Sequence, residues 1–265
     1  MKAYTSGDIR RKKMKKITKL LLGGALVILL LALPSQVKAD WHQDNIGWWY
    51  STNNGSYYKD TLAYIDNNIY RFDERGYMIT GWYLEEHRNT NGSLYREWSY
   101  FDPVSGARLK GWQQIDGKWY YFIDYSIYNY ALKGFNKIDG KEYYFDPVNA
   151  DMKTGWISRQ SDVKKWYYYD PESGERLLGW KDIDGKKYYL TSEGAYYGHT
   201  YTIDGKLYYF DPVTCELITG WFEYNGRKRY GDPNDGGALA LNKTLIIDGV
   251  SYSFSDSGAL ITNKP

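Results

Sequence analysis

The sequence predicts an all-β fold, a β-hairpin repeat solenoid preceded by an N-terminal signal-peptide helix. The first observation is the aromatic composition: Trp, Tyr and Phe make up 18% of the 265 residues, with 11 Trp and 30 Tyr but only 8 Phe. Tyr and Trp in such excess suit half-exposed surfaces, where one edge of the ring is buried and the other is wet. The second observation is that the tripeptide Ile-Asp-Gly recurs along the chain, and the third is that no helical hydrophobic period follows residue 40.

The first 39 residues are predicted to be a secretory signal peptide. Basic residues from Arg10 to Lys19 precede an apolar run over residues 20–33, and Val37-Lys38-Ala39 has the small-x-small pattern of a signal peptidase site. The run is shorter than the roughly 20 residues that a membrane-spanning helix needs, so an uncleaved membrane anchor fits less well. We therefore expect a signal peptide, residues 1–39, and a repeat domain, residues 40–265, in a secreted protein without a stable membrane anchor after cleavage.

Removing the predicted signal peptide changes the charge of the chain. The full sequence has 34 Lys and Arg against 32 Asp and Glu, but residues 1–39 hold nine of the basic residues and one of the acidic ones. The remaining 25 basic and 31 acidic residues give a net charge of −6. Nucleic acid is therefore excluded as an expected partner, because phosphate neutralisation needs a basic face.

The repeat unit is about 20–23 residues long and has the same parts each time. Gly-Trp opens it, an Asp-Gly or Asn-Gly turn follows, and an aromatic strand such as residues 119–122 leads through an Asp-Pro-x-x-Gly turn to the next Gly-Trp. Residues 41–60 are predicted to form a modified first unit that caps the array. Ile-Asp-Gly marks the first turn at residues 115–117, 138–140, 183–185, 203–205 and 247–249.

Each unit is predicted to be a β-hairpin. Asp-Gly and Asn-Gly tolerate the positive φ angles of a type I′ turn, whose twist matches the flanking strands. Side chains alternate along a strand, so Trp119 and Tyr121 share one face while Tyr120 and Phe122 share the other. Because an isolated hairpin is marginal in water, neighbouring units are expected to stack and bury one aromatic face continuously, as in a solenoid.

The string Gly-Trp…Asp-Gly-Lys-Trp-Tyr-Tyr-Phe…Gly-Trp in residues 111–156 resembles the choline-binding, or cell-wall-binding, repeat family. That family is found on surface proteins and wall hydrolases of Gram-positive bacteria and their phages. The resemblance covers residues 41–260, and the same units are also similar to the glucan-binding repeats of glucosyltransferases and the carbohydrate-binding repeats of clostridial toxins. It implies a place at the cell wall or cell surface, with choline-substituted teichoic acid or a wall polysaccharide as the partner.

In choline-binding members of the family, an aromatic cage takes the Trp of Gly-Trp and the Trp of Trp-Tyr-Tyr from one unit and the second Tyr from the next. Quaternary ammonium is held there because ring faces carry partial negative charge. The resemblance therefore implies three choline sites in this chain: Trp112, Trp119 and Tyr144; Trp82, Trp98 and Tyr121; and Trp156, Trp166 and Tyr189.

Several units depart from the family pattern. The second of these sites carries a longer loop, residues 84–97, and the third carries a smaller insertion, residues 159–163. Phe135 and His199 replace the Trp of Gly-Trp in two units, which we expect to be spacers rather than choline sites. The second Trp is replaced in four units, so that those sites lack one cage wall: the replacements are Glu142, Lys187, Leu207 and Lys228.

Two functions remain open for the repeats. The first is non-covalent attachment of a secreted, non-catalytic protein to choline-bearing teichoic acid through the aromatic cages. The second is the binding of glucan or another wall or surface polysaccharide, where aromatic rings stack on sugars and Asp or Asn side chains take the hydroxyls. A repeated ring can also serve stacking alone, as we expect of Tyr120 and Phe122.

No catalytic role, metal site or cofactor is predicted, because no stretch outside the repeats is long enough for a catalytic domain after residue 40. The single cysteine, Cys215, excludes an intrachain disulfide or Cys-based zinc site and is expected to fill a Ser- or Asn-like turn position. The three histidines lie in different units without metal-ligand spacing: His42, His87 and His199. A charged loop holds three carboxylates that we expect to be solvated: Glu85, Glu86 and Glu97.

Overall fold

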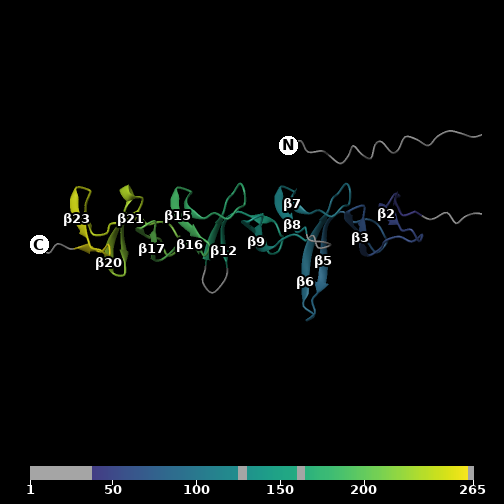
Figure 1. Ribbon diagram of the computed structural model, residues 1–265, viewed down its shortest axis with the longest axis horizontal. Helices are drawn as coiled ribbons and strands as arrows, with labels where there is room; N and C mark the ends of the chain where they lie inside the picture. The colour runs from purple at the N-terminus through teal and green to yellow at the C-terminus, as the bar shows by residue number, and fades with distance from the viewer. Residues whose placement is uncertain (1–37, 125–129, 160–164, 262–265) are drawn as a thin grey trace, which may run out of the picture.

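Antiparallel β-hairpins make up nearly all of the structure, a computed structural model that describes residues 38–124, 130–159 and 165–261. The all-β prediction is confirmed, and the helical element in this part of the chain is a single short 3-10 helix, η3 (Pro233–Asp235). Ten hairpins follow one another along the long axis of the described residues, so the first and last hairpins lie at opposite ends of the molecule (Figure 1). Apart from residues 38 and 39, the predicted signal peptide lies outside the described residues.

The hairpins have strands of similar length, with one exception in the third. In chain order they pair β1 (Asp40–Gln43) with β2 (Trp48–Ser51), β3 (Thr61–Ile65) with β4 (Asn68–Phe72), β5 (Gly81–Arg88) with β6 (Leu94–Phe101), β7 (Gly111–Ile115) with β8 (Lys118–Phe122), β9 (Gly134–Ile138) with β10 (Lys141–Phe145), β12 (Gly155–Arg159) with β13 (Lys165–Tyr169), β14 (Gly179–Ile183) with β15 (Lys186–Thr191), β17 (Thr200–Ile203) with β18 (Lys206–Tyr209), β19 (Gly220–Tyr224) with β20 (Arg227–Asp232), and β22 (Lys243–Ile247) with β23 (Val250–Phe254). Four of them gain a short third strand: β11 (Met152–Lys153), β16 (Gly194–Ala195), β21 (Ala238–Leu239) and β24 (Leu260–Ile261).

The Asp-Gly turns form where the sequence predicts them. In β7–β8, Ile115 pairs with Lys118, which leaves Asp116 and Gly117 as the two turn residues. Both have positive φ, 49° and 76°, as a type I′ turn requires. A two-residue turn fixes the register of the two strands, and the register decides which side chains share a face.

Each hairpin packs one face on the hairpin before it and the other on the hairpin after it. Phe122 is fully buried and lies with Ile115 and Tyr120 in a cluster that Trp82 and Trp98 of the preceding hairpin complete. The corresponding position of six other hairpins is also occupied by a ring that is almost entirely buried: Phe72, Phe101, Phe145, Tyr169, Phe210 and Phe254.

A ladder of ion pairs runs beside this aromatic packing. A lysine that opens the second strand of one hairpin meets a carboxylate in the segment after the next hairpin, as in Lys165–Glu193 at 2.7 Å and Lys186–Glu216 at 2.6 Å. One partner of each pair is more than half exposed, so each pair adds little to stability by itself. The other three pairs of the ladder are Lys118–Asp151, Lys141–Glu175 and Lys206–Asp235.

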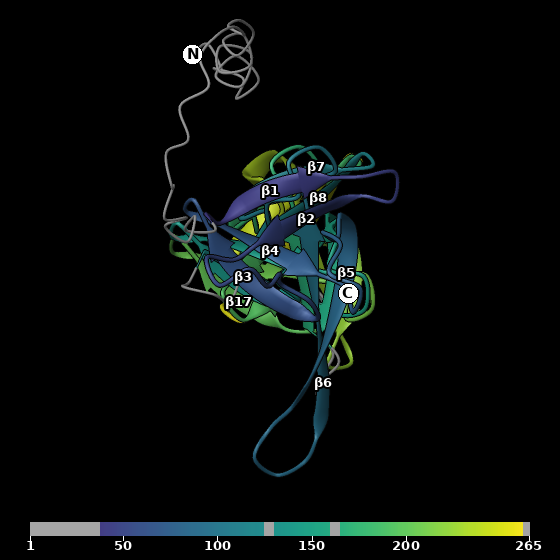
Figure 2. The same cartoon turned by 90° about the vertical axis from the view of Figure 1, so that its right-hand side faces the viewer.

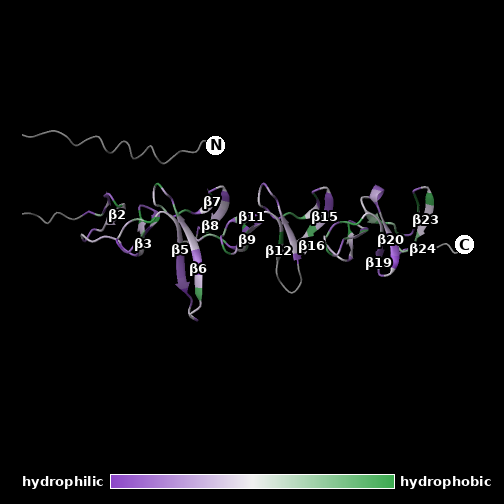
Figure 3. Cartoon of the chain, turned by 180° about the vertical axis from the view of Figure 1, so that it is seen from behind, coloured by the Kyte–Doolittle hydropathy of each residue, from purple (hydrophilic) through white to green (hydrophobic). Residues whose placement is uncertain are grey.

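The insertion predicted as a long loop lengthens the third hairpin. β5 continues to Arg88 and β6 begins at Leu94, so the β5–β6 hairpin projects well beyond its neighbours (Figure 2). Residues 160–164, most of the smaller insertion, lie outside the described residues. Hydrophobic stretches are short and spread along the array (Figure 3), and the described residues contain no helix long and apolar enough to cross a membrane.

Replacing Phe122 by alanine should unfold the array more easily, because the ring is fully buried between two hairpins. We expect Phe122→Ala to lower the free energy of unfolding by about 3–5 kcal/mol in urea titrations followed by circular dichroism. The matched control is Tyr64→Ala, which removes a strand ring that is 68% exposed and should cost less than about 1 kcal/mol. Equal losses from the two variants would contradict the packing described above.

Candidate functional site

Pairs of tryptophans lie close together on single hairpins at two of the predicted sites. In β7–β8 the rings of Trp112 and Trp119 lie 6.3 Å apart at 83°. In β5–β6 the rings of Trp82 and Trp98 lie 6.0 Å apart at 81°. Two rings at right angles form two walls of a corner that can face a cation from two sides.

The third ring of each site comes from the first tyrosine of the next hairpin. Trp112 lies 4.8 Å from Tyr143, and Trp82 lies 4.8 Å from Tyr120, which we had expected to stack only. The expected third wall, Tyr144, instead packs on Phe135 of its own hairpin at 4.6 Å. Alternation along the strand is the cause, because neighbouring tyrosines point to opposite faces.

The same shift of one residue applies to the other two predicted sites. Trp156 lies 4.8 Å from Tyr188, whereas Tyr189 packs on Trp180 of its own hairpin at 5.1 Å. Tyr121 likewise lies against Trp112 of its own hairpin, at 5.2 Å, and not in the site of the hairpin before.

A turn from farther along the chain closes two of these sites. Trp82, Trp98 and Tyr120 line a hollow of about 390 Å³ that Asn149, from the turn after β10, completes. Trp156 and Trp166 line a hollow of about 240 Å³ with residues 213–215, from the turn after β18. Each site therefore uses three successive parts of the array, and the tryptophans alone do not define it.

Cys215 occupies a small-residue position in that turn. It has a positive φ of 64°, where Gly106, Ala150 and Gly174 stand in the equivalent turns. The expectation of a Ser- or Asn-like position is therefore wrong, since the thiol is buried and packs beside the site. Burial raises the pKa of the Cys215 thiol to about 11.

The first hairpin holds a fourth set of rings that the sequence analysis missed. Trp48 occupies the strand position that Trp119 has in β7–β8. Gln43 pairs with Trp48 in the first hairpin, as Gln114 pairs with Trp119. Trp41 lies 4.8 Å from Tyr70 of the next hairpin, as in the other sites. The turn between β1 and β2 lacks Asp-Gly, which concealed the unit. The available signal was the spacing of seven residues between the two tryptophans, which Trp112 and Trp119 share.

The second, fifth and eighth hairpins lack the first tryptophan, and the last hairpin has Thr244 at that position. Leu62, Phe135 and Thr200 hold that position, since each pairs with the residue that faces the tryptophan elsewhere. The expectation that His199 replaces the tryptophan is wrong by one residue, because the register puts Thr200 opposite Tyr209. The interface after each of these hairpins carries an arginine on an aromatic ring: Arg71 on Tyr83, Arg176 on Tyr167 and Arg229 on Tyr224.

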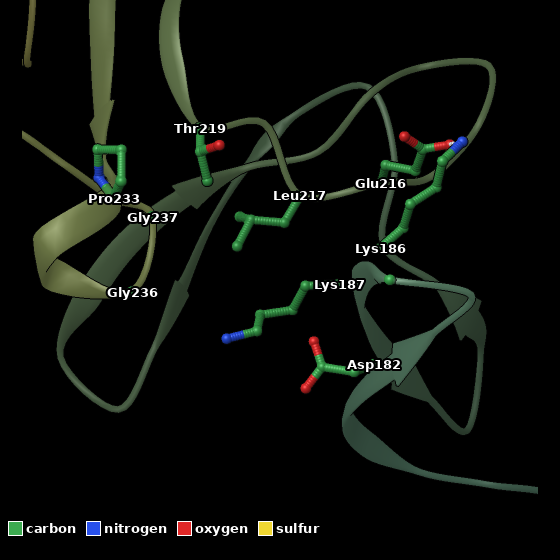
Figure 4. A pocket seen from close by; sticks show the side chains of 10 residues that line it. Asp182, Lys186, Lys187, Glu216, Leu217, Thr219, Pro233, Gly236 and Gly237 are labelled. Atoms are coloured by element: carbon green, nitrogen blue, oxygen red, sulfur yellow. Dashed lines mark hydrogen bonds and ion pairs between the residues drawn. The ribbon is translucent and has the colours of Figure 1, made fainter.

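The residues that replace the second tryptophan behave differently from one another. Glu142 forms an ion pair with Arg176 at 2.7 Å. Lys228 places its ammonium nitrogen 4.4 Å from the centre of the Trp221 ring. Lys187 lines a polar hollow of about 340 Å³ with Asp182 and the glycines of the turn after η3. Figure 4 shows the Lys187 and Asp182 side chains extended into the open space of this hollow.

A buried polar cluster lies on the projecting β5–β6 hairpin. The Glu85 carboxylate accepts hydrogen bonds from Arg108 at 3.0 Å and from the Tyr130 hydroxyl at 3.1 Å, so the expectation that it is solvated is wrong. Glu86 is exposed as expected, whereas Glu97 is half-buried and burial raises its pKa. The ion pair fixes the long hairpin to the segments that follow it. No group of three or more His, Cys, Asp or Glu in the described part of the chain is placed to hold a metal ion.

Comparison with known proteins finds a family match for one stretch of these repeats. Residues 132–178 match the family model of the choline-binding repeat. A lysin of Pneumococcus phage Dp-1 is 38% identical over 64 residues, which cover 23% of this chain and 21% of the lysin. The match thus spans about a fifth of that relative.

Two solved structures from Streptococcus pneumoniae have a similar fold. Choline binding protein F superposes with a TM-score of 0.54 at 22% identity, over 84% of this chain and 99% of that one. The modular autolysin LytC superposes with a TM-score of 0.50 at 22% identity, over 84% of this chain and 48% of the autolysin. The hairpin array is therefore a fold found both in a choline-binding protein and as part of an autolysin.

The buried thiol of Cys215 should react slowly in the folded protein. With a pKa of about 11, about one thiol in a thousand is ionised at pH 8, and the thiolate is the reactive form. We expect reaction with a disulfide reagent such as DTNB at pH 8 to be at least about 100-fold slower in buffer than in 8 M urea. Cys215→Ala gives the background, and equal rates with and without urea would contradict the burial.

Proposed function

We propose that the chain is a secreted, non-catalytic protein that attaches non-covalently to choline-bearing teichoic acid of the cell wall. One observation carries the proposal: a perpendicular pair of tryptophans closed by a tyrosine of the next hairpin. The same arrangement is given by ring contacts in β5–β6 and β7–β8, and by register in β1–β2. The matched repeat segment includes the pair Trp156 and Trp166.

The chemistry of these corners suits a quaternary ammonium ion. Such a cation is attracted to ring faces and is not hydrated as tightly as a primary ammonium, so little is lost when it leaves water. The excess of acidic residues, 31 against 25 basic ones after residue 39, also favours a cationic ligand.

One cage would not hold a protein on a wall. Three ring faces at roughly 0.5–2 kcal/mol each give an affinity of about millimolar. Several cages spaced along a solenoid can engage several cholines of one polymer, and effective concentration then raises the avidity by about 10² or more. The repetition of the hairpins is therefore part of the binding mechanism that we propose.

Retention on a choline-like resin tests the function. The secreted protein should bind a resin that carries quaternary or tertiary amines and should elute with free choline at tens of millimolar, about the level that saturates millimolar sites. The control resin carries the same linker without the amine. Folded protein, as judged by circular dichroism, that passes through the amine resin would contradict the proposal.

Single-ring variants test the geometry of one cage. Trp119→Leu should weaken choline binding at that site by about 2- to 30-fold without loss of folding, because it removes one cation–π face and the ring is 42% exposed. Tyr143→Leu should weaken the same site, and Tyr144→Leu should not, since Tyr144 lies on the other face of its strand. Calorimetric titration with choline measures these effects. A larger loss from Tyr144→Leu would contradict the assignment of Tyr143.

A wall polysaccharide is the second candidate ligand. The polar hollow at Lys187 and Asp182 favours it, because charged and backbone groups there could take sugar hydroxyls (Figure 4). Pull-down with purified wall polysaccharide that lacks choline separates the two candidates. Binding that free choline does not displace, and that Asp182→Ala weakens, would support the polysaccharide.

A further inference from the structure

The ninth hairpin, β19–β20, contains two walls of a cage. Trp221 lies 4.8 Å from Tyr252 and 5.8 Å from Phe254 of the last hairpin. The equivalent distances for Trp112 and the next hairpin are 4.8 and 5.9 Å. The first tryptophan and the tyrosine of the next hairpin are therefore placed as in the proposed choline sites.

A lysine takes the position of the second tryptophan in this hairpin. Lys228 pairs with Glu223 at the step of the ladder where Trp119 pairs with Gln114 in β7–β8. Its ammonium nitrogen lies 4.4 Å from the centre of the Trp221 ring, which is the position of a cation held by the ring face. Within the described residues Lys228 takes part in no ion pair, so the ring is the partner that the structure gives to its charge.

Lys187 shows that a lysine at this position does not have to lie on the ring. It belongs to the seventh hairpin, where Trp180 lies 4.9 Å from Tyr208 of the next hairpin. The two walls are the same, but the Lys187 side chain extends into the polar hollow that it shares with Asp182 (Figure 4). The contact between Lys228 and Trp221 is therefore a property of the ninth hairpin and not of every unit with this substitution.

We propose that the Lys228 ammonium is the built-in occupant of the Trp221 site, where it takes the place of an external quaternary ammonium and closes the site to choline. The inference rests on the proposed function, since it concerns which units of the array bind choline. A cation tethered to the neighbouring strand meets the ring at high effective concentration. The same substitution removes the ring that would form the second wall. The ninth hairpin thus holds a cation on its own ring without a ligand, while Trp221 joins the last two hairpins through its contact with Tyr252.

Indole N–H resonances in a choline titration test this inference, with each resonance assigned by its Trp→Phe variant. In the wild-type protein we expect the Trp112 resonance to move with choline and the Trp221 resonance to stay. Lys228→Trp supplies the missing wall and removes the internal cation, so Trp221 should then respond and one more choline should bind per chain. Lys228→Met removes the charge alone and should strengthen the weak response of Trp221 by about 2- to 5-fold, the effect of losing an exposed cation–π competitor.

Two results would overturn the inference: movement of the wild-type Trp221 resonance at the choline concentrations that move Trp112, or no added site in a folded Lys228→Trp protein. Failure of the proposed function looks different, because no indole resonance would then respond to choline. In that case the spectra recorded without choline test the contact between Lys228 and Trp221 by itself. Lys228→Met must shift the Trp221 resonance, while the matched control Lys187→Met leaves the Trp180 resonance in place. A Trp221 resonance unmoved by Lys228→Met would overturn the internal contact itself.

Discussion

The structure depends on one contact, the packing of a hairpin's tryptophan on the first tyrosine of the next hairpin. Within the described residues this contact recurs at six interfaces, with ring centroids 4.8–4.9 Å apart in an edge-to-face arrangement. A two-stranded hairpin alone is marginally stable, so each unit relies on the area that it buries against its neighbours. The high content of Trp and Tyr follows, because these rings join successive hairpins while their other edges stay wet.

A ligand site needs one more aromatic ring beside this contact between tryptophan and tyrosine. The tryptophan and tyrosine that join two hairpins already form two walls, and an exposed ring such as Trp119 supplies the third. Because Trp119 is 42% exposed while Tyr120 beside it is 7% exposed, the site and the fold depend on different positions of the same strand. A substitution at the second-tryptophan position can therefore change a cage without disturbing the array, as the ion pair of Glu142 and the ring contact of Lys228 illustrate.

Sequence patterns were sufficient for the hairpins with Asp-Gly or Asn-Gly turns and for three of the four tryptophan pairs, because two-residue turns and strand alternation are local. The third cage wall was assigned by resemblance to Tyr144, although alternation alone puts Tyr143 on the face that meets the preceding hairpin. The pairing of Arg108 with Glu85 could not be predicted, since 23 residues separate them and a longer hairpin brings them together. Nor could the turn containing Asn149 be placed over the Trp82 site, because that contact depends on how three successive hairpins stack.

The loss of tryptophan from every third hairpin changes how the array is joined. Arginines lie at those interfaces, and one of them, Arg176, is paired with the Glu142 carboxylate of the preceding hairpin. Edge-to-face ring contacts tolerate some rotation, whereas charge-assisted hydrogen bonds are directional. The arginine interfaces therefore fix the orientation of the hairpins on either side more firmly than the ring contacts do. Cages separated by such an interface keep a defined relation to one another, as simultaneous binding to one polymer requires.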